Sequence, residues 1–251
     1  MKVDGGASTE AARLRKAWDE RGRSESRDFY VASHPGWDDP AARGAQARLD
    51  ATRALRGLEL RLHGLHVLEI GCGVGRLASP IASRVRSYTG LDIAPSMIAE
   101  ARARLAGQGG ARFLECDGLS VPDAARDREY DLVLAHAVFI HCPRSVIESW
   151  IRAALDVTAA GGELRLQLRA DVTDAGGLSE PVSPQAHAQA AAQRAEVKRR
   201  PAHLDLATDK DYMGHAFGWS EAREFLSQLA RGALELERPD PTFFAATLRR
   251  D

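Results

Sequence analysis

The sequence predicts an α/β fold with a doubly wound, mostly parallel sheet of seven strands and helices on both of its faces. Short apolar runs rich in β-branched residues alternate with helical patterns between residues 66 and 168. A glycine-rich turn over 71–75 directly follows the first run. Runs over 233–237 and 242–249 have no helix between them and predict a terminal antiparallel hairpin. Strands separated by single helices run parallel, so their carboxyl ends share the edge where ligands bind.

The elements follow one another at regular spacing. Ahead of the sheet, residues 1–8 are expected to be unstructured, and helices are expected over 9–21 and 41–62. The expected strands cover 66–70, 87–93, 112–117, 130–137 and 163–168, and the helices between and after them cover 76–84, 95–106, 120–127, 144–159 and 220–231.

Between Arg169 and Trp219 the alternation stops. This stretch contains paired glycines, two prolines and a predicted helix over 185–199. We interpret it as a lid or substrate cap, with a solvated linker as the alternative, because residues 212–217 are too apolar and aromatic for a linker. The predicted organisation is therefore an N-terminal lid segment (1–40) and a core domain (41–251) with a cap insertion at about 170–218.

Composition excludes several classes of protein. The 34 basic and 35 acidic residues balance, so no overall field attracts nucleic acid or anionic membrane. No apolar run approaches the length of a membrane span, and the chain does not begin with an apolar segment, so we expect a cytoplasmic protein. Cys72, Cys116 and Cys142 lack metal-type spacing. We expect no metal, the alternative being a thiol or metal site with His136 and His141.

The turn over 71–75 predicts a nucleotide-cofactor site. Glycine lets a ligand lie directly against the backbone, and the amides that open the next helix favour its polar or negative groups. The third glycine comes one position too early for the dinucleotide fingerprint, and no Gly-Lys-Ser/Thr follows, which disfavours NAD and ATP. Glu69 precedes the first glycine by two residues. Asp92, at the end of the second expected strand, can accept hydrogen bonds from both hydroxyl groups of an unphosphorylated ribose.

Four stretches, over 67–77, 90–97, 113–118 and 130–141, together resemble the class I S-adenosylmethionine-dependent methyltransferases, whose fold is Rossmann-like. The resemblance runs from about residue 43 to the end of the chain. It implies the cofactor S-adenosylmethionine and the product S-adenosylhomocysteine. It also implies that Asp117 binds the adenine amino group. The cofactor contacts that we predict from the motifs and the resemblance together are Tyr30, Glu69, Gly71, Gly73, Gly75, Arg76, Asp92, Ile93, Met97, Asp117, Gly118, Leu119 and Ala135.

The sequence gives less specific evidence for the site of the methyl acceptor than for the cofactor site. His141 is the first candidate for a general base and His136 the second, because both follow the fourth strand and imidazole titrates near neutral pH. A structural role for His141 is the alternative. The predicted acceptor contacts are Trp18, His141, Tyr212, His215 and Phe217.

The expected reaction is methyl transfer to a nitrogen or oxygen of a small molecule by a monomer or homodimer. The composition favours natural-product biosynthesis. Two alternatives stay open: a dinucleotide-dependent oxidoreductase, and an S-adenosylmethionine-binding protein without catalytic activity.

Overall fold

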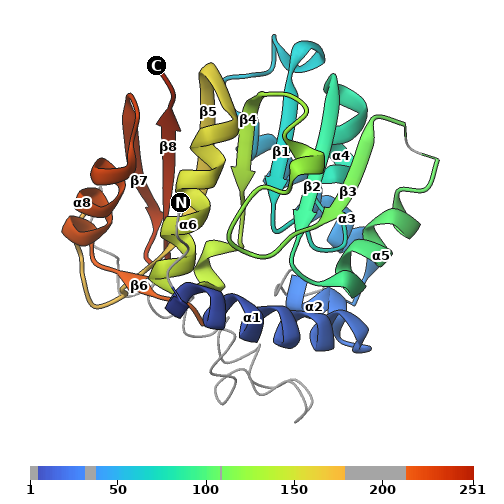
Figure 1. Cartoon of the computed structure of the whole chain (residues 1–251), viewed down its shortest axis with the longest axis horizontal. Coiled ribbons are helices and arrows are strands. Elements are labelled where there is room, and N and C mark those ends of the chain that lie inside the picture. The colour runs from blue at the N-terminus through green and yellow to red at the C-terminus, as the bar shows by residue number, and fades with distance from the viewer. Residues whose placement is uncertain (1–4, 32–37, 108, 179–212) are drawn as a thin grey trace.

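A computed structural model describes residues 5–31, 38–107, 109–178 and 213–251. It confirms the predicted fold class: the sheet has the strand order β3-β2-β1-β4-β5-β8-β7 (Figure 1). β1 to β5 run parallel, and β8 is antiparallel to both β5 and β7. An eighth strand, the two-residue β6, pairs with the end of β5. The strands are β1 (His66–Ile70), β2 (Ser87–Asp92), β3 (Ala111–Glu115), β4 (Tyr130–Ala135), β5 (Thr158–Ala170), β6 (Ala216–Phe217), β7 (Leu234–Asp240) and β8 (Phe243–Arg249).

Helices cover both faces of the sheet because successive strand residues alternate between them. One face carries Val67, Leu132 and Leu134, in one apolar cluster with residues of α3 (Pro40–Ala54), α4 (Ala78–Ile81) and α5 (Pro95–Arg104). The other face carries Leu68, Val133 and Leu164, which cluster with α6 (Arg144–Val157) and α8 (Trp219–Leu229). Figure 1 shows α6 in front of the sheet and α3 behind it. Short 3-10 turns lie at Leu62–Gly64, Ala82–Arg84, Asp123–Ala125 and Phe139–His141.

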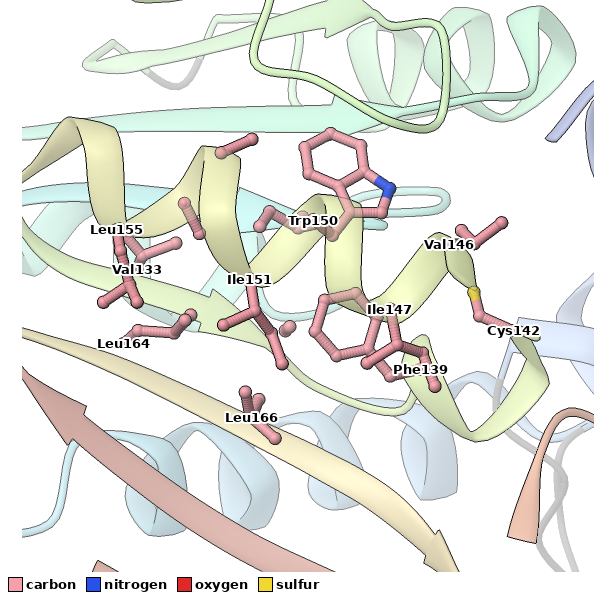
Figure 2. Close-up of a cluster of buried hydrophobic side chains, with 14 of the residues drawn as sticks. Val133, Phe139, Cys142, Val146, Ile147, Trp150, Ile151, Leu155, Leu164 and Leu166 are labelled. Atoms are coloured by element: carbon pink, nitrogen blue, oxygen red, sulfur yellow. The ribbon is translucent and has the colours of Figure 1, made fainter. Parts of the chain in front are cut away.

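Helix α6 contributes much of the core on its face of the sheet. Its apolar residues recur at helical spacing, and Ile147, Ile151 and Leu155 are fully buried. Figure 2 shows these side chains pointing toward Val133, Leu164 and Leu166 of the sheet. The start of α6 therefore has a fixed position at the carboxyl edge of the sheet, beside the loop that follows β4.

The N-terminal segment forms two helices, α1 (Gly5–Arg23) and α2 (Arg27–Val31). Residues 5–8 are helical, contrary to the prediction, because Ala7 is buried and extends the apolar face that includes Ala11 and Leu14. Figure 1 shows α1 lying along the edge where the parallel strands end. The Asp19 carboxylate accepts a hydrogen bond from the Ser96 amide at the start of α5 (2.9 Å), which joins α1 to the core.

Some boundaries differ from prediction for local reasons. The helix expected over 41–62 ends at Ala54, because Gly57 has a positive φ of 82° and the chain then turns to bury Leu58 and Leu62. The helix expected from 76 begins at Ala78, after the glycine turn. Most of the predicted cap insertion lies outside the described residues. No described helix has the length and apolarity needed to cross a membrane.

We predict that Ile151→Ala lowers the free energy of unfolding by about 2–5 kcal/mol, because it leaves a cavity between α6 and the sheet. Urea denaturation measures this loss. The matched control is Arg152→Ala on the exposed side of the same helix, which should change stability by no more than about 0.5 kcal/mol. Equal effects of the two substitutions would contradict the packing assigned to α6.

Candidate active site

A cavity lies at the carboxyl ends of β1, β2 and β4, and we call it the glycine-loop cavity. It brings together many of the predicted cofactor contacts from separate elements. β1 and the turn after it contribute Glu69, Gly71, Gly73 and Arg76. The end of β2 and the start of α5 contribute Asp92, Ile93 and Met97. Gly118 follows β3, and Tyr30 comes from α2. This position is the edge at which parallel sheets bind ligands.

The sharp turn after β1 depends on glycine at position 71. Gly71 has a φ of 70°, and a Cβ there would lie 2.3 Å from Cγ2 of Val138. Asp92 fixes the next residues, because its Oδ2 accepts a hydrogen bond from the Gly73 amide (2.8 Å). Its Oδ1 accepts one from the Ala94 amide (2.9 Å). Burial raises the pKa of Asp92 to about 6. A buried carboxylate therefore joins the glycine turn to β2 and borders the cavity.

Glu69 is a second buried carboxyl group in the cavity wall. Its side chain accepts a hydrogen bond from the hydroxyl of Tyr88 on β2, and the residue is only 3% exposed. Burial raises the pKa of Glu69 to about 7, against the opposing effects of the Tyr88 hydrogen bond and of Arg76. The glycine turn thus has a titratable carboxyl group at its start.

Arg76 and His136 border the cavity together and share a partner on α3. The carboxylate of Asp50 forms an ion pair with Arg76 and lies 3.8 Å from Nε2 of His136. Burial opposes ionisation of Asp50, but its bonds to His136 and Arg76 prevail and lower its pKa to about 2. Sequence reasoning missed Asp50, because its position in an ordinary amphipathic helix gives no sign of a partner 26 residues away.

Aromatic residues of the N-terminal helices cover the cavity. Trp18 of α1 packs edge-on against the His141 ring, with 5.0 Å between ring centroids. The Arg21 guanidinium lies over the rings of Trp18 and Tyr30, at 4.8 and 5.5 Å. The predicted candidates Trp18, Tyr30 and His141 are thus brought into one wall.

A second cavity adjoins the first and shares Leu14 and His141 with it. It lies between α1, the start of α6 and residues 213–215. The Gly214 and His215 amides donate hydrogen bonds to the carbonyls of Ile140 and Cys142, both at 3.0 Å. Nε2 of His215 is 2.9 Å from Oε1 of Glu221. The predicted acceptor contact His215 therefore faces a space that meets the glycine-loop cavity at His141.

The structure does not place four predicted cofactor contacts in the glycine-loop cavity. Gly75 instead packs against α5, where a Cβ would lie 2.6 Å from Cδ1 of Leu105. Asp117 is exposed, and its carboxylate accepts hydrogen bonds from the amides of Leu119 (2.8 Å) and Ser120 (2.7 Å). Leu119 and Ala135 belong to the apolar core below the cavity.

Among the predicted acceptor contacts that the structure describes, Phe217 alone lines neither cavity. Phe217 is fully buried beside Phe225, at 5.2 Å between ring centroids, so it belongs to the core rather than to an acceptor site. Tyr212 lies outside the described residues.

Several cavity residues were not predicted as contacts. Val31, Val138 and Trp150 line the glycine-loop cavity, and so do Cys72, Cys116 and Cys142. Cys72 and Cys116 come just after β1 and β3, and Cys142 comes after the turn that follows β4, so their positions near strand ends are the available sequence signal. All three are buried, and burial raises the pKa of each thiol above its ordinary value. Within the described part of the chain, no three His, Cys, Asp or Glu side chains are grouped to hold a metal ion.

Comparison with known proteins agrees with this geometry. Residues 67–162 match a family model described as a methyltransferase domain. The matched region contains the glycine turn, Asp92 and the loop that bears His141. The ubiquinone biosynthesis O-methyltransferase of Xanthomonas oryzae pv. oryzae (strain PXO99A) is 30% identical over 150 residues, which cover 57% of this chain and 60% of that protein. The chain thus matches less than two thirds of the length of this relative.

Solved structures share the fold of this chain at low sequence identity. Magnesium protoporphyrin IX methyltransferase from Synechocystis PCC 6803, with bound S-adenosylhomocysteine, is 18% identical with a TM-score of 0.61, over 96% of this chain and 100% of that chain. The N-methyltransferase NodS from Bradyrhizobium japonicum WM9, also with S-adenosylhomocysteine, is 16% identical with a TM-score of 0.57, over 94% of this chain and 98% of that chain.

We predict that Glu69→Gln changes how stability depends on pH. In the folded chain Glu69 keeps its proton to a higher pH than its ordinary pKa of 4.5 allows. The folded state therefore loses stability relative to the unfolded state as pH rises from about 4.5 to about 7. The substitution removes this loss. Relative to the variant, the wild-type protein should lose roughly 1–3 kcal/mol of unfolding free energy across that window.

Urea denaturation at about pH 5 and at about pH 7.5 measures the difference. The exposed Glu224→Gln serves as the control and should differ from wild type equally at both pH values. A pH-independent effect of Glu69→Gln would show that Glu69 ionises at its ordinary pH.

Proposed function

We propose that the protein is an S-adenosylmethionine-dependent methyltransferase that transfers a methyl group to a nitrogen or oxygen of a small molecule. The observation that carries the proposal is the pair of adjoining cavities that meet at Leu14 and His141. One lies over the glycine turn and is bordered by buried carboxyl groups, and the other opens between α1, α6 and residues 213–215. A transferase needs two such spaces, one for the donor and one for the acceptor.

The residues around the glycine-loop cavity fit the proposed cofactor. Asp92 is a buried carboxylate at the end of β2, where a ribose with two free hydroxyls would be bound. Ile93 and Met97 supply apolar surface for a purine ring. Glu69 in its ionised form and Arg76 carry opposite charges beside the glycine turn, which suits the charged groups of an amino acid. The predicted contact of Asp117 with the adenine amino group receives no support from the geometry, because that carboxylate is bonded within its own turn.

The cofactor supplies an electrophilic methyl group on a cationic sulfur, so the protein contributes mainly alignment. Alignment of two reactants contributes on the order of 7–11 kcal/mol to lowering a barrier. His141 lies where the two cavities meet and is our candidate for the base that accepts a proton from a hydroxyl acceptor. His136 is the second candidate, and its Nε2 lies 3.8 Å from the Asp50 carboxylate.

The second cavity supports a small-molecule acceptor. Arg13, Arg144 and His215 border it together with the apolar Leu14 and Met213, so it offers both polar and apolar surface. The names of the relatives point in different directions, to ubiquinone biosynthesis in one case and to magnesium protoporphyrin in another. Both remain candidates beside the natural-product role that the composition favours.

Two measurements test the proposed function. Isothermal titration should detect binding of S-adenosylhomocysteine and no binding of NAD. Incubation with S-adenosylmethionine and a panel of catechols, phenols and amines should then release S-adenosylhomocysteine with at least one acceptor. NAD binding without S-adenosylhomocysteine binding would favour an oxidoreductase. Cofactor binding without turnover of any acceptor would favour a non-catalytic binding protein.

We predict that Asp92→Asn weakens binding of S-adenosylhomocysteine by about 1.5–3 kcal/mol, the value of a hydrogen bond to a charged group. Titration calorimetry measures this change. The matched control is Asp127→Asn, because Asp127 pairs with Arg112 and Arg128 and does not border the cavity. An unchanged dissociation constant for Asp92→Asn would remove Asp92 from the cofactor site.

We predict that His141→Gln lowers the turnover of a hydroxyl acceptor by about 10²-fold or more at neutral pH, the lower range for loss of a general base. Its affinity for S-adenosylhomocysteine should stay within about twofold of wild type. Release of S-adenosylhomocysteine over time measures turnover. Normal turnover in this variant would leave His141 with a structural role against Trp18.

A further inference from the structure

We propose that Tyr88 is a positioning residue that holds Glu69 ready to receive the amino group at the amino-acid end of the cofactor. The inference rests on the proposed function, because it requires S-adenosylmethionine or its product in the glycine-loop cavity. Tyr88 does not border that cavity and acts through Glu69, which does.

The sheet register brings the two side chains together. Val67 of β1 pairs with Tyr88 of β2, and Glu69 pairs with Gly90, so Tyr88 and Glu69 lie on the same face of neighbouring strands. Gly90 has no side chain opposite Glu69, and Phe113 and Cys72 pack where its Cβ would lie. The hydroxyl donates a hydrogen bond to Oε2 of Glu69, and Tyr88 is fully buried.

The hydrogen bond from Tyr88 affects both the orientation of the Glu69 side chain and its ionisation. Burial raises the pKa of Glu69, Tyr88 and Arg76 lower it, and the nearby Asp92 raises it, with a net value of about 7. Without the hydroxyl, less of Glu69 would be ionised at neutral pH, and its side chain would lose a fixed direction. An ammonium group binds a carboxylate more strongly than a neutral carboxylic acid, so both effects weaken binding in the same direction.

Other charged or titratable groups around Glu69 come from every neighbouring element. They are Cys72 and Arg76 after β1, Asp92 at the end of β2, and His136 after β4, while Asp50 of α3 acts through its ion pair with Arg76. These groups contribute their own pH dependence to ligand binding. The test therefore compares variants that leave all of them in place.

The experiment compares two ligands by titration calorimetry. S-adenosylhomocysteine carries the amino-acid end, and 5′-methylthioadenosine has the same nucleoside without it. Tyr88→Phe should weaken binding of S-adenosylhomocysteine about tenfold, the size expected for one such hydrogen bond, and leave 5′-methylthioadenosine within about twofold. A merely structural role for Tyr88 would weaken both ligands alike.

Tyr130→Phe is the matched control. Tyr130 is also fully buried on a central strand, but its hydroxyl donates to the Ala125 carbonyl (2.8 Å), and the residue does not border the cavity. It should leave the affinities for both ligands unchanged. In the Glu69→Gln background, Tyr88→Phe should add no further loss of affinity, because the carboxylate through which it acts is gone.

The pH profile gives a second readout. In the wild-type protein, affinity for S-adenosylhomocysteine should rise as pH increases through about 7, where Glu69 loses its proton. In Tyr88→Phe the rise should move to higher pH. An unshifted profile, or equal loss for the two ligands, would overturn the role of Tyr88. If wild-type protein binds neither S-adenosylhomocysteine nor S-adenosylmethionine, the proposed function itself fails and the inference fails with it.

Discussion

The carboxylate of Asp92 makes the contacts on which the geometry of this site depends. It accepts hydrogen bonds from the Gly73 amide in the turn and from the Ala94 amide ahead of α5, and so joins the ends of β1 and β2 to the start of a helix. The glycine turn is also held through its backbone, because the Cys72 amide donates a hydrogen bond to the Leu91 carbonyl of β2 (2.9 Å) and the Gly75 amide donates one to the Cys72 carbonyl (2.9 Å). A buried anion that is bonded on both sides gives this turn a fixed position under the proposed ligand.

Local motifs were enough to predict the fold and to indicate many of the residues that line the glycine-loop cavity. Alternating strands and helices depend mainly on residues close together in the sequence, so their pattern can be recognised locally. The turn over 71–75 and Asp92 lie at the strand ends that this pattern predicts. Asp50 and Val31 could not be found in this way, because each reaches the site through the packing of a separate helix. Asp117 shows the opposite case, since its position follows the motif but its carboxylate is bonded to the turn beyond it.

Helix α1 closes the site through polar as well as apolar contacts. Leu14 is buried beside both cavities, while Asp19 bonds to Ser96 and Arg15 pairs with Glu115 (3.2 Å). The Arg15 pair is close to half exposed on both sides, so salt screens it and its contribution to holding the helix is small. The aromatic contact of Trp18 with His141 therefore links the position of α1 more directly to the proposed chemistry.

The backbone bonds between Gly214–His215 and Ile140–Cys142 have a consequence for evolution within this fold. Residues 214–215, near the end of the predicted cap insertion, and the loop that bears His141 form one short ladder, so a mutation that moves the first should also move the second. Under the proposed function, a change in acceptor contacts at this ladder would also shift His141 and so change the catalytic rate. Lineages that change substrate should therefore pass through slow intermediates and recover speed by compensating changes near residue 141.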